Sequence, residues 1–437
     1  MNTMPLLAGL IALATPATLC AADARPEPER LKSTVEKLVS FGTRHTLSSP
    51  DDPKRGIGAA RRWAAGEFSK ISKSCGGCIQ VETVEKVFTG PRAPDGAKIV
   101  DVLAIKPGKM GWKHVIIVAG HIDSRVTDVM NFTDDAPGAN DDGSGSALVM
   151  EAARVIAADP QGEATIIFAL LSGEEQGLFG GKLLADTAKE RGWQVSAMLN
   201  NDIVGNSIRT DGKVVDDRVR IFSEGIRASE DMAGQLARRG SGGEDDGPSR
   251  ALMRVPLGIS RNRPDIGLSV LAVRRPDRFS RGGDHLPALE LGYPAIRFTV
   301  GAENYDAQHQ DLRTENGKVY GDTVDRMDFN YLAKVTALNI ATMRELGNAP
   351  PAPQSATLAG ALGSDTTISW TPVEGADHYL VYVRSADQTD WQRSIRSDAP
   401  ELLVKDTVVD DNFFGVAAVS KSGEQSIVTF AGLPPRK

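Results

Sequence analysis

The pattern of apolar and polar positions predicts buried strands that alternate with amphipathic helices. Leu31, Val35 and Leu38 recur at helical spacing, which predicts a helix over residues 29–39. Further helices are expected over residues 56–71, 146–158 and 178–191, and buried strands over 99–105, 115–119, 164–171, 197–199, 268–273 and 295–300. Strands that alternate with helices predict an α/β domain, with a mostly parallel mixed sheet covered by helices on both faces.

The pattern changes near residue 347. Residues 348–355 are rich in proline, which predicts a stiff linker. Beyond this linker, apolar and polar residues alternate with a period of two, as around Ile368 and Trp370, and turn residues separate the short strands. We therefore expect an α/β domain over residues 23–347 and a small all-β sandwich over residues 356–437.

The first residues of the chain have the composition of a secretory signal. Residues 1–22 contain no Asp, Glu, Lys or Arg, and residues 6–14 form an apolar run. This predicts a signal peptide over residues 1–22 and a secreted or periplasmic protein. Pro5 and Pro16 leave an apolar stretch that is too short to span a membrane. Lipid modification of Cys20 is the alternative interpretation.

Cys75 and Cys78 are the two cysteines that remain after residue 22. Two thiols this close in an oxidising compartment are expected to form a disulfide. A redox-active pair is the alternative, although no thioredoxin-like βαβ pattern surrounds these cysteines.

The net charge of the chain narrows the classes of partner that the protein is expected to bind. The net charge is -7, whereas a protein that binds nucleic acid is usually basic. The same charge gives no support for attraction to anionic membranes. We expect neither a nucleic-acid partner nor a membrane span, and the sequence does not specify an oligomeric state.

Imidazole and carboxylate side chains follow the predicted strands. The positions are His121 and Asp123, Asp141 and Asp142, Glu174 and Glu175, Asp202, and His309. Ligands of open α/β sheets bind beyond the carboxyl ends of the strands, so we expect these groups to converge. Such ligands without thiolate suit catalytic zinc, and cobalt or manganese fits the same groups. They are more than one catalytic zinc needs, which favours two metal ions that share a bridging carboxylate.

Each of these residues also has a structural interpretation. Asp141 and Asp142 could cap the helix that follows them. Glu174 and Glu175 could complement a helix N-terminus, and Asp202 could be a turn residue. The metal interpretation is favoured because all these groups follow apolar strands of one domain.

The motifs that carry these residues resemble those of a known family. Gly-His-Ile-Asp-Ser, Gly-Ala-Asn-Asp-Asp-Gly-Ser-Gly and Gly-Glu-Glu-Gln-Gly occur in this order, followed by Asn-Asp-Ile and a late His. Over residues 33–346 the chain resembles the co-catalytic dinuclear zinc aminopeptidases, the group that contains bacterial leucyl aminopeptidases and is related to glutamate carboxypeptidases. The resemblance implies a zinc exopeptidase-like fold and two Zn²⁺ ions per chain. It implies these ligands: His121 and Asp202 for one ion, Glu175 and His309 for the other, and Asp141 as the bridge.

The resemblance also implies roles beyond the metal ligands. Glu174 is expected to be the general base, and Asp123 is expected to orient His121. His285, in Gly-Gly-Asp-His-Leu-Pro, matches a segment that lines the pocket, so it either touches substrate or has a structural role. The family often has a Tyr before the late His, and this Tyr helps to stabilise the oxyanion. Gln308 occupies that place, so either Tyr305 reaches the site or another donor serves.

The resemblance favours a secreted aminopeptidase that acts on peptides with a free N-terminus. A carboxypeptidase or dipeptidase for acidic peptides is one alternative, because clustered arginines could bind a carboxylate. These arginines are Arg274, Arg275, Arg278 and Arg281. A glutaminyl cyclase with a single zinc is another alternative. An inactive binding module is the third, because residues 356–437 resemble a fibronectin type III domain through Ser-Trp-Thr-Pro and Tyr-Leu-Val-Tyr-Val-Arg.

Overall fold

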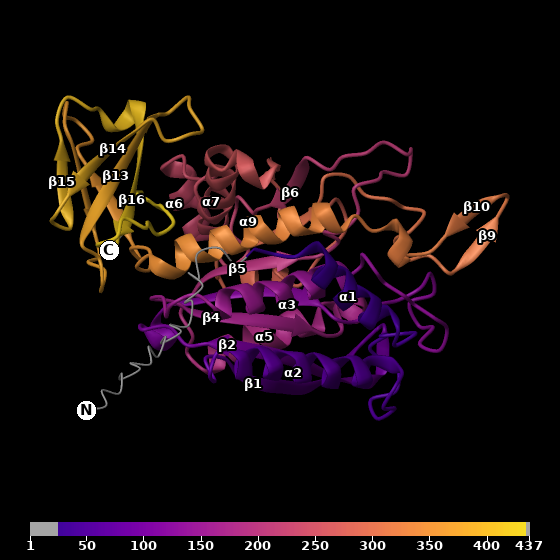
Figure 1. Ribbon diagram of the computed structural model, residues 1–437. Helices are drawn as coiled ribbons and strands as arrows, with labels where there is room; N and C mark the ends of the chain where they lie inside the picture. The colour runs from indigo at the N-terminus through magenta and orange to yellow at the C-terminus, as the bar shows by residue number, and fades with distance from the viewer. Residues whose placement is uncertain (1–24, 434–437) are drawn as a thin grey trace, which may run out of the picture.

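A sheet of eight strands forms the centre of the molecule (Figure 1). The computed structural model describes residues 25–433, so the signal peptide expected over residues 1–22 lies outside the described residues. The strand order is β1-β2-β4-β3-β5-β8-β6-β7. Their bounds are β1 (Gln80–Gly90), β2 (Ala93–Lys106), β3 (Val115–His121), β4 (Thr165–Leu171), β5 (Val195–Asn201), β6 (Arg218–Phe222), β7 (Ser269–Val273) and β8 (Ala295–Val300).

The sheet is mixed, with parallel pairing at its centre. β3 pairs in parallel with β4 and β5, β5 with β8, and β6 with β7. The β1–β2, β2–β4 and β6–β8 pairs are antiparallel. The α/β class and the mixed sheet that the sequence predicts are confirmed, whereas β1 and β6 were not predicted.

Two hydrophobic cores lie on the two faces of this sheet. Ile116 and Val118 of β3 pack in one core, and Ile117 and Ala119 pack in the other, because successive side chains of a strand point to opposite faces. The first core is covered by α1 (Pro28–Val39), α2 (Gly56–Ser74), α3 (Gly143–Ala157), α7 (Pro248–Asn262) and α9 (Phe329–Asn348), and the second by α5 (Phe179–Glu190) and α8 (Leu286–Glu290). β3 and β4 are therefore buried at every position, which explains their continuous apolar sequences.

Shorter elements lie in the connections. They are α4 (Glu174–Gly177), α6 (Met232–Gly240), the hairpin of β9 (Arg313–Glu315) and β10 (Lys318–Tyr320), and 3-10 turns at Gly111–Lys113, Pro264–Ile266, Val324–Arg326 and Val409–Asp411. Cys75 and Cys78, just after α2, form a disulfide. No helix within residues 25–433 combines the length and the apolar character needed to cross a membrane.

A small all-β domain follows α9, as the sequence predicts. One sheet contains β11 (Ala356–Ala359), β12 (Thr366–Trp370) and β15 (Glu401–Val404), and the other contains β13 (His378–Ser385), β14 (Arg393–Ser397), β16 (Asn412–Val419) and β17 (Thr429–Phe430). The two sheets enclose a separate core around Ile368, Val381 and Phe414. The likeness to a fibronectin type III domain stays a prediction.

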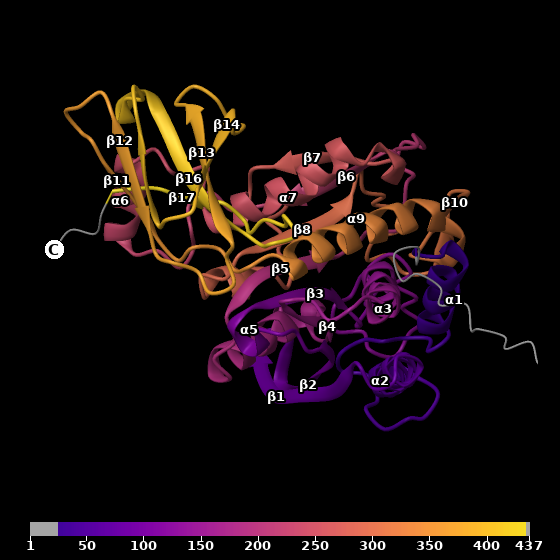
Figure 2. The ribbon, with the colours of Figure 1, turned by 60° about the vertical axis from the view of Figure 1, so that its left-hand side comes forward.

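The C-terminal domain packs beside α6 and α7 (Figure 2). Asp246, whose side chain is 1% exposed, connects the two parts of the chain. Its Oδ2 lies 2.5 Å from Arg384 Nη2 of the C-terminal domain, and its Oδ1 lies 2.7 Å from Arg254 Nη1 of α7. One buried carboxylate therefore pairs with two guanidinium groups across this contact.

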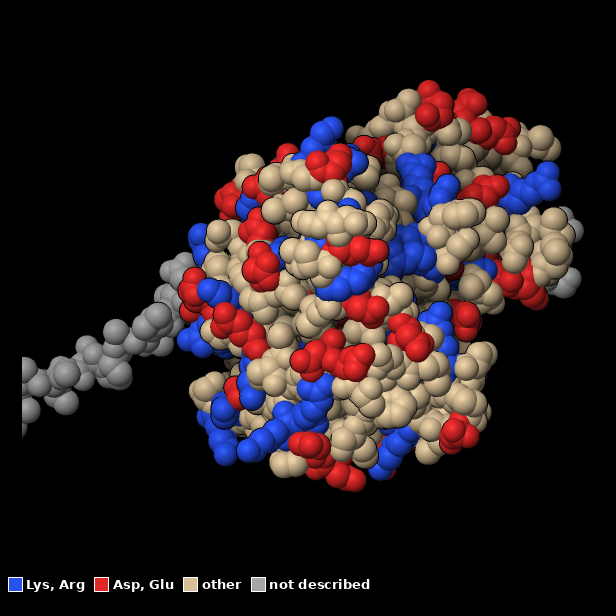
Figure 3. Space-filling view, turned by 90° about the vertical axis from the view of Figure 1, so that its right-hand side faces the viewer, with Lys and Arg blue, Asp and Glu red and all other residues tan. Residues whose placement is uncertain are grey.

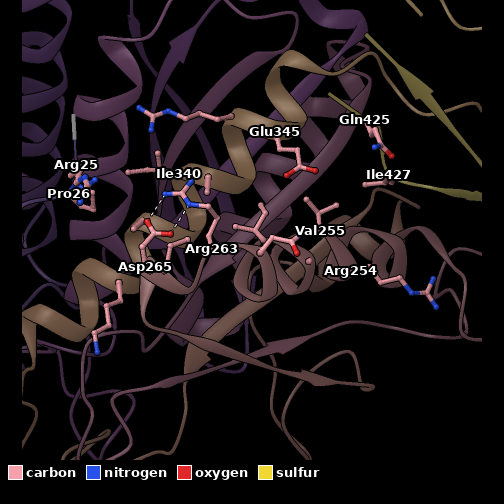
Figure 4. Close-up of a pocket in the computed structure, with 18 of the residues that line it drawn as sticks. Arg25, Pro26, Arg254, Val255, Arg263, Asp265, Ile340, Glu345, Gln425 and Ile427 are labelled. Carbon is pink, nitrogen blue, oxygen red and sulfur yellow. Dashed lines mark hydrogen bonds and ion pairs between the residues drawn. The ribbon is translucent and has the colours of Figure 1, made fainter. Parts of the chain in front are cut away.

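A cleft of about 840 Å³ lies between α7, α9 and the C-terminal domain (Figure 4). Val255 and Ile340 contribute apolar surface to it, and Arg263 and Asp265 form an ion pair of 2.8 Å beside it. The candidate metal ligands do not line this cleft.

We expect Asp246→Ala to lower the free energy of unfolding by about 3–5 kcal/mol, because it leaves two guanidinium groups without their buried partner. Chemical denaturation of the variant and of the wild type measures this change. Glu374→Ala is the matched control, because the Lys113–Glu374 pair is exposed on both sides, and we expect no measurable change. Equal stability of Asp246→Ala and wild type would show that this ion pair does not support the domain contact.

Candidate metal centre

The candidate ligands lie in loops at the carboxyl ends of neighbouring strands. His121 is the last residue of β3, and Asp202 directly follows β5. Glu174 and Glu175 begin α4, which comes just after β4. His309 lies in the connection after β8. Its φ of 56° falls in the left-handed region, which is uncommon for residues other than glycine. The parallel pairing of β3, β4, β5 and β8 therefore brings segments far apart in sequence to one edge.

Six of the predicted site residues form two adjacent clusters. In each cluster, one nitrogen or oxygen atom per residue lies within 4.8 Å of the others. The first cluster is His121, Glu174 and Asp202, and the second is Asp141, Glu175 and His309. His121 Nε2 lies 3.2 Å from Asp141 Oδ1, so the two clusters share a border at Asp141.

The donor atoms fit a divalent metal ion. His121 Nε2 and Glu175 Oε1 are buried, and within the described residues neither atom forms a hydrogen bond. Buried polar atoms in native proteins usually have a partner. An imidazole nitrogen and carboxylate oxygens without thiolate suit zinc. These residues therefore fit the metal that the sequence predicts.

The adjacent residues Asp141 and Asp142 have different environments. Asp142 Oδ1 accepts the N–H of Gly145 at 2.9 Å, which caps α3, and Oδ2 accepts the N–H of His121 at 3.0 Å. A Cβ at Gly145 would lie 2.1 Å from the carbonyl oxygen of Asn201, so only glycine permits this approach of α3 to β5. The capping interpretation thus holds for Asp142, while Asp141 belongs to the second cluster.

The loop that carries Asp141 is held by two buried residues that sequence reasoning missed. The carboxylate of Asp322 accepts the backbone N–H of Asp141 at 2.7 Å and that of Asn140 at 3.0 Å. The fully buried guanidinium of Arg44 donates to the carbonyl oxygens of Pro137 and Gly138. These contacts fix the backbone on both sides of the loop.

Asp123 lies where it can orient His121. The backbone carbonyl oxygen of Asp123 lies 3.1 Å from His121 Nδ1, and its carboxylate Oδ1 lies 3.5 Å from the same nitrogen. Its Oδ2 accepts the hydroxyl of Thr46 at 2.9 Å and the N–H of Glu175 at 3.3 Å. Asp123 therefore connects the loops after β3 and β4 next to the two clusters.

Two arginines also contact the clusters, and sequence reasoning missed both. Arg297, fully buried on β8, lies 2.7 Å from Asp202 Oδ1 and 2.9 Å from Asp277 Oδ2. Arg125 donates to Glu175 Oε2 at 2.7 Å, and its Nη2 lies 2.6 Å from His309 Nδ1. The sequence signal that could have identified Arg297 is its charge within the apolar run over residues 295–300.

The crowded charges shift several pKa values. Burial, followed by the charges of Asp202 and Glu175, raises the pKa of Glu174 well above its usual range. Burial opposes a charge on His309, but Glu175 and Asp141 outweigh it and raise the pKa of this imidazole to about 10. Nε2 of His309, the nitrogen that faces the cluster, lies 2.8 Å from Asp141 Oδ2 and 3.3 Å from Glu175 Oε1.

The predicted substrate-binding residues, His285 and Tyr305, are not members of the two clusters. His285 is fully buried, and its Nε2 lies 2.7 Å from the carbonyl oxygen of Pro276. Tyr305 is 61% exposed, and its backbone N–H donates to the hydroxyl of Thr210. Gln308, in the position where the resemblance expects Tyr, donates its Nε2 to Asp141 Oδ2 at 3.3 Å. Contact of His285 or Tyr305 with substrate stays a prediction.

Comparison with known proteins identifies the family. Residues 101–239 match the model of Peptidase family M28. A probable zinc metalloprotease of Pyrenophora tritici-repentis is 42% identical over 404 residues, which cover 91% of this chain and 83% of that protein. The chain belongs to peptidase family M28. A second relative with the description probable zinc metalloprotease, from Leptosphaeria maculans, is 40% identical and covers 91% of this chain and 92% of its own.

Solved structures show the same fold as this M28 zinc metalloprotease. The LapA aminopeptidase of Legionella pneumophila has a TM-score of 0.52 at 20% identity, covering 74% of this chain and 72% of its own. A glutaminyl cyclase of an Acidobacteriales bacterium has a TM-score of 0.51 at 18% identity, covering 77% and 99%. At these identities the likeness shows the fold alone.

We expect Arg297→Gln to destabilise this M28 protein by about 3–5 kcal/mol, because Asp202 and Asp277 lose the cation between them inside the protein. Arg297→Lys keeps the charge but not the fork that reaches both carboxylates, so we expect it to be intermediate. Thermal and chemical unfolding measure the effect. Arg263→Gln, which breaks an exposed pair with Asp265, is the control. A loss no greater than in this control would contradict the structural role of Arg297.

Proposed function

We propose that this zinc metalloprotease is an aminopeptidase that uses two zinc ions to remove the N-terminal residue of peptides. The observation that carries the proposal is the pair of adjacent three-residue clusters that meet at Asp141. Each cluster contains imidazole and carboxylate atoms of the kind that zinc binds, and Asp141, where the clusters meet, would bridge the two ions. With the signal peptide expected over residues 1–22, the proposal includes secretion or export to the periplasm.

The protein residues have distinct tasks in this proposal. His121 and Asp202 would hold one zinc ion, Glu175 and His309 the other, and Asp141 both. When bound, zinc ions polarise the scissile carbonyl and lower the pKa of bound water, so that this water can lose a proton near neutral pH. Asp123 and Arg297 hold His121 and Asp202 in place through the contacts described above.

Glu174 is the proposed general base. It is half-buried in the first cluster and is not needed to complete the set of bridging and terminal ligands. Its carboxylate accepts the proton of the attacking water and then donates a proton to the leaving amine.

The charge of the site favours a free N-terminus. The carboxylates of Glu174 and Asp202 lie in one cluster and that of Glu175 in the adjacent one, and acidic groups such as Glu174 attract a substrate ammonium. LapA, a fold neighbour described as an aminopeptidase, is in keeping with this specificity. Amino-acid anilides compared with N-blocked acidic dipeptides test it, and turnover of the blocked dipeptides alone would favour a carboxypeptidase or dipeptidase.

We expect Glu174→Gln to keep its zinc and to lose activity by roughly 10²- to 10⁴-fold, because the amide cannot accept the proton of water. The measurements are kcat on an amino-acid anilide and the zinc content of the same sample. Glu190→Gln, at the exposed end of α5, is the matched control and should leave kcat unchanged. Full activity of Glu174→Gln would remove this residue from the mechanism.

We expect the purified chain to hold two zinc ions, and Asp141→Asn to weaken the binding of both. Metal analysis after dialysis, with the wild type and the variant side by side, measures the stoichiometry.

Chelation of zinc should also lower Tm. Zinc binds the folded chain, and its removal leaves the crowded carboxylates of the folded state without a cation between them. A single zinc ion per wild-type chain would instead favour glutaminyl cyclisation, the activity for which one fold neighbour is named.

A further inference from the structure

Three arginines converge on one buried carboxylate beside the second metal cluster. Glu303, whose side chain is 3% exposed, lies 2.7 Å from Arg220 Nη2, 2.8 Å from Arg281 Nη1 and 3.5 Å from Arg278 Nη1. Burial alone favours the neutral acid, but Arg278, Arg220 and Arg281 outweigh it and lower the pKa of Glu303. One negative charge therefore faces three positive charges.

Asp277, the other acidic residue that contacts Arg278, does not neutralise the surplus positive charge. Asp277 lies 3.2 Å from Arg278 Nε, but it also pairs with Arg297, which is shared with Asp202. Arg278 is 8% exposed, and its buried Nη1, although 3.5 Å from Glu303, forms no hydrogen bond within the described residues. A buried charged donor without a hydrogen bond is costly, and an anionic ligand can supply the missing acceptor.

Arg281 extends this charge to the metal clusters. Its Nη1 donates to Gln308 Oε1 at 3.3 Å, and Gln308 Nε2 donates to Asp141 Oδ2 at 3.3 Å. Both contacts of Arg281, with Glu303 and Gln308, use the same nitrogen, and a guanidinium has five N–H donors. Its side chain is 31% exposed, so its other donors can meet a ligand from solvent.

Figure 3 views the molecule from the side on which the β9–β10 hairpin lies in Figure 1, and it shows a group of basic side chains with acidic side chains around it. Arg274 does not contribute a free charge, because it is paired with Asp245 at 2.6 Å.

We propose that Arg281, supported by Arg278, binds a carboxylate of the substrate just beyond the cleaved bond. This inference rests on the proposed function, and it narrows the substrates to short or acidic peptides with a free N-terminus. Arg281 and Asp141 are connected through Gln308 by two hydrogen bonds of 3.3 Å, a span of about two residues of an extended peptide, so Arg281 can reach a carboxylate on the residue after the cleaved bond. The carboxylate belongs either to the C-terminus of a dipeptide or to an acidic side chain.

Binding to a form that cleaves slowly tests the inference without relying on turnover. The zinc-loaded full chain with Glu174→Gln is titrated calorimetrically with Leu-Leu, Leu-Leu amide and Leu-Glu amide, with and without Arg281→Gln. We expect Arg281→Gln to weaken the binding of a ligand with the recognised carboxylate by roughly 10- to 100-fold more than it weakens the binding of Leu-Leu amide. A loss confined to Leu-Leu identifies the C-terminal carboxylate, and a loss confined to Leu-Glu amide identifies the side chain.

Two further variants separate recognition from folding. Arg281→Lys keeps the charge without the planar fork, so it should recover part of the preference. Arg274→Gln removes a neighbouring arginine that is already paired and should leave all three affinities unchanged. An Arg281→Gln effect that is equal for all three ligands, or absent, overturns the inference.

The outcomes also distinguish this inference from the proposed function. If the wild type cleaves none of these peptides, the proposed function fails, while the preference for carboxylates is still read from binding. If the wild type cleaves them and Arg281→Gln changes no preference, only the inference fails. If none of the three peptides binds, both are contradicted.

Discussion

The crowding of buried negative charge at one edge of the sheet is the constraint on which the site depends. Asp141, Glu175 and Asp202 belong to the two adjacent clusters, Asp123 lies beside His121, and all four carboxylates are buried. Carboxylates cannot remain ionised away from water unless cations or hydrogen-bond donors face them. Arg297 faces Asp202, Arg125 faces Glu175, and bound zinc would supply further positive charge.

Hydrogen bonds around this edge of the sheet satisfy further buried polar groups. Backbone N–H groups donate to Asp142 and Asp322, and the guanidinium of Arg44 donates to backbone carbonyls. The connection that carries Asp141 and Asp142 is thereby held by buried polar contacts on both sides. Contacts of this kind keep candidate metal ligands in a fixed orientation.

Much of the fold could be predicted because the buried strands and amphipathic helices have clear periodicity. β3 and β8 begin where the apolar runs begin, and α1 follows the spacing of Leu31, Val35 and Leu38. β1 was missed because it lies at the edge of the sheet and alternates little, with one buried position in eleven residues. α9 was missed although it is long, because its buried residues include Thr336, Asn339 and Thr342.

The sequence by itself determined the ligand types, their order along the chain and their places after apolar strands, because local patterns encode where a strand ends and which side chains follow it. Only the tertiary structure decided which aspartate caps α3 and which belongs to a cluster. It also decided that Arg125 and Arg297 contact the clusters, because contacts between residues that are far apart in the chain leave no periodic signal in it.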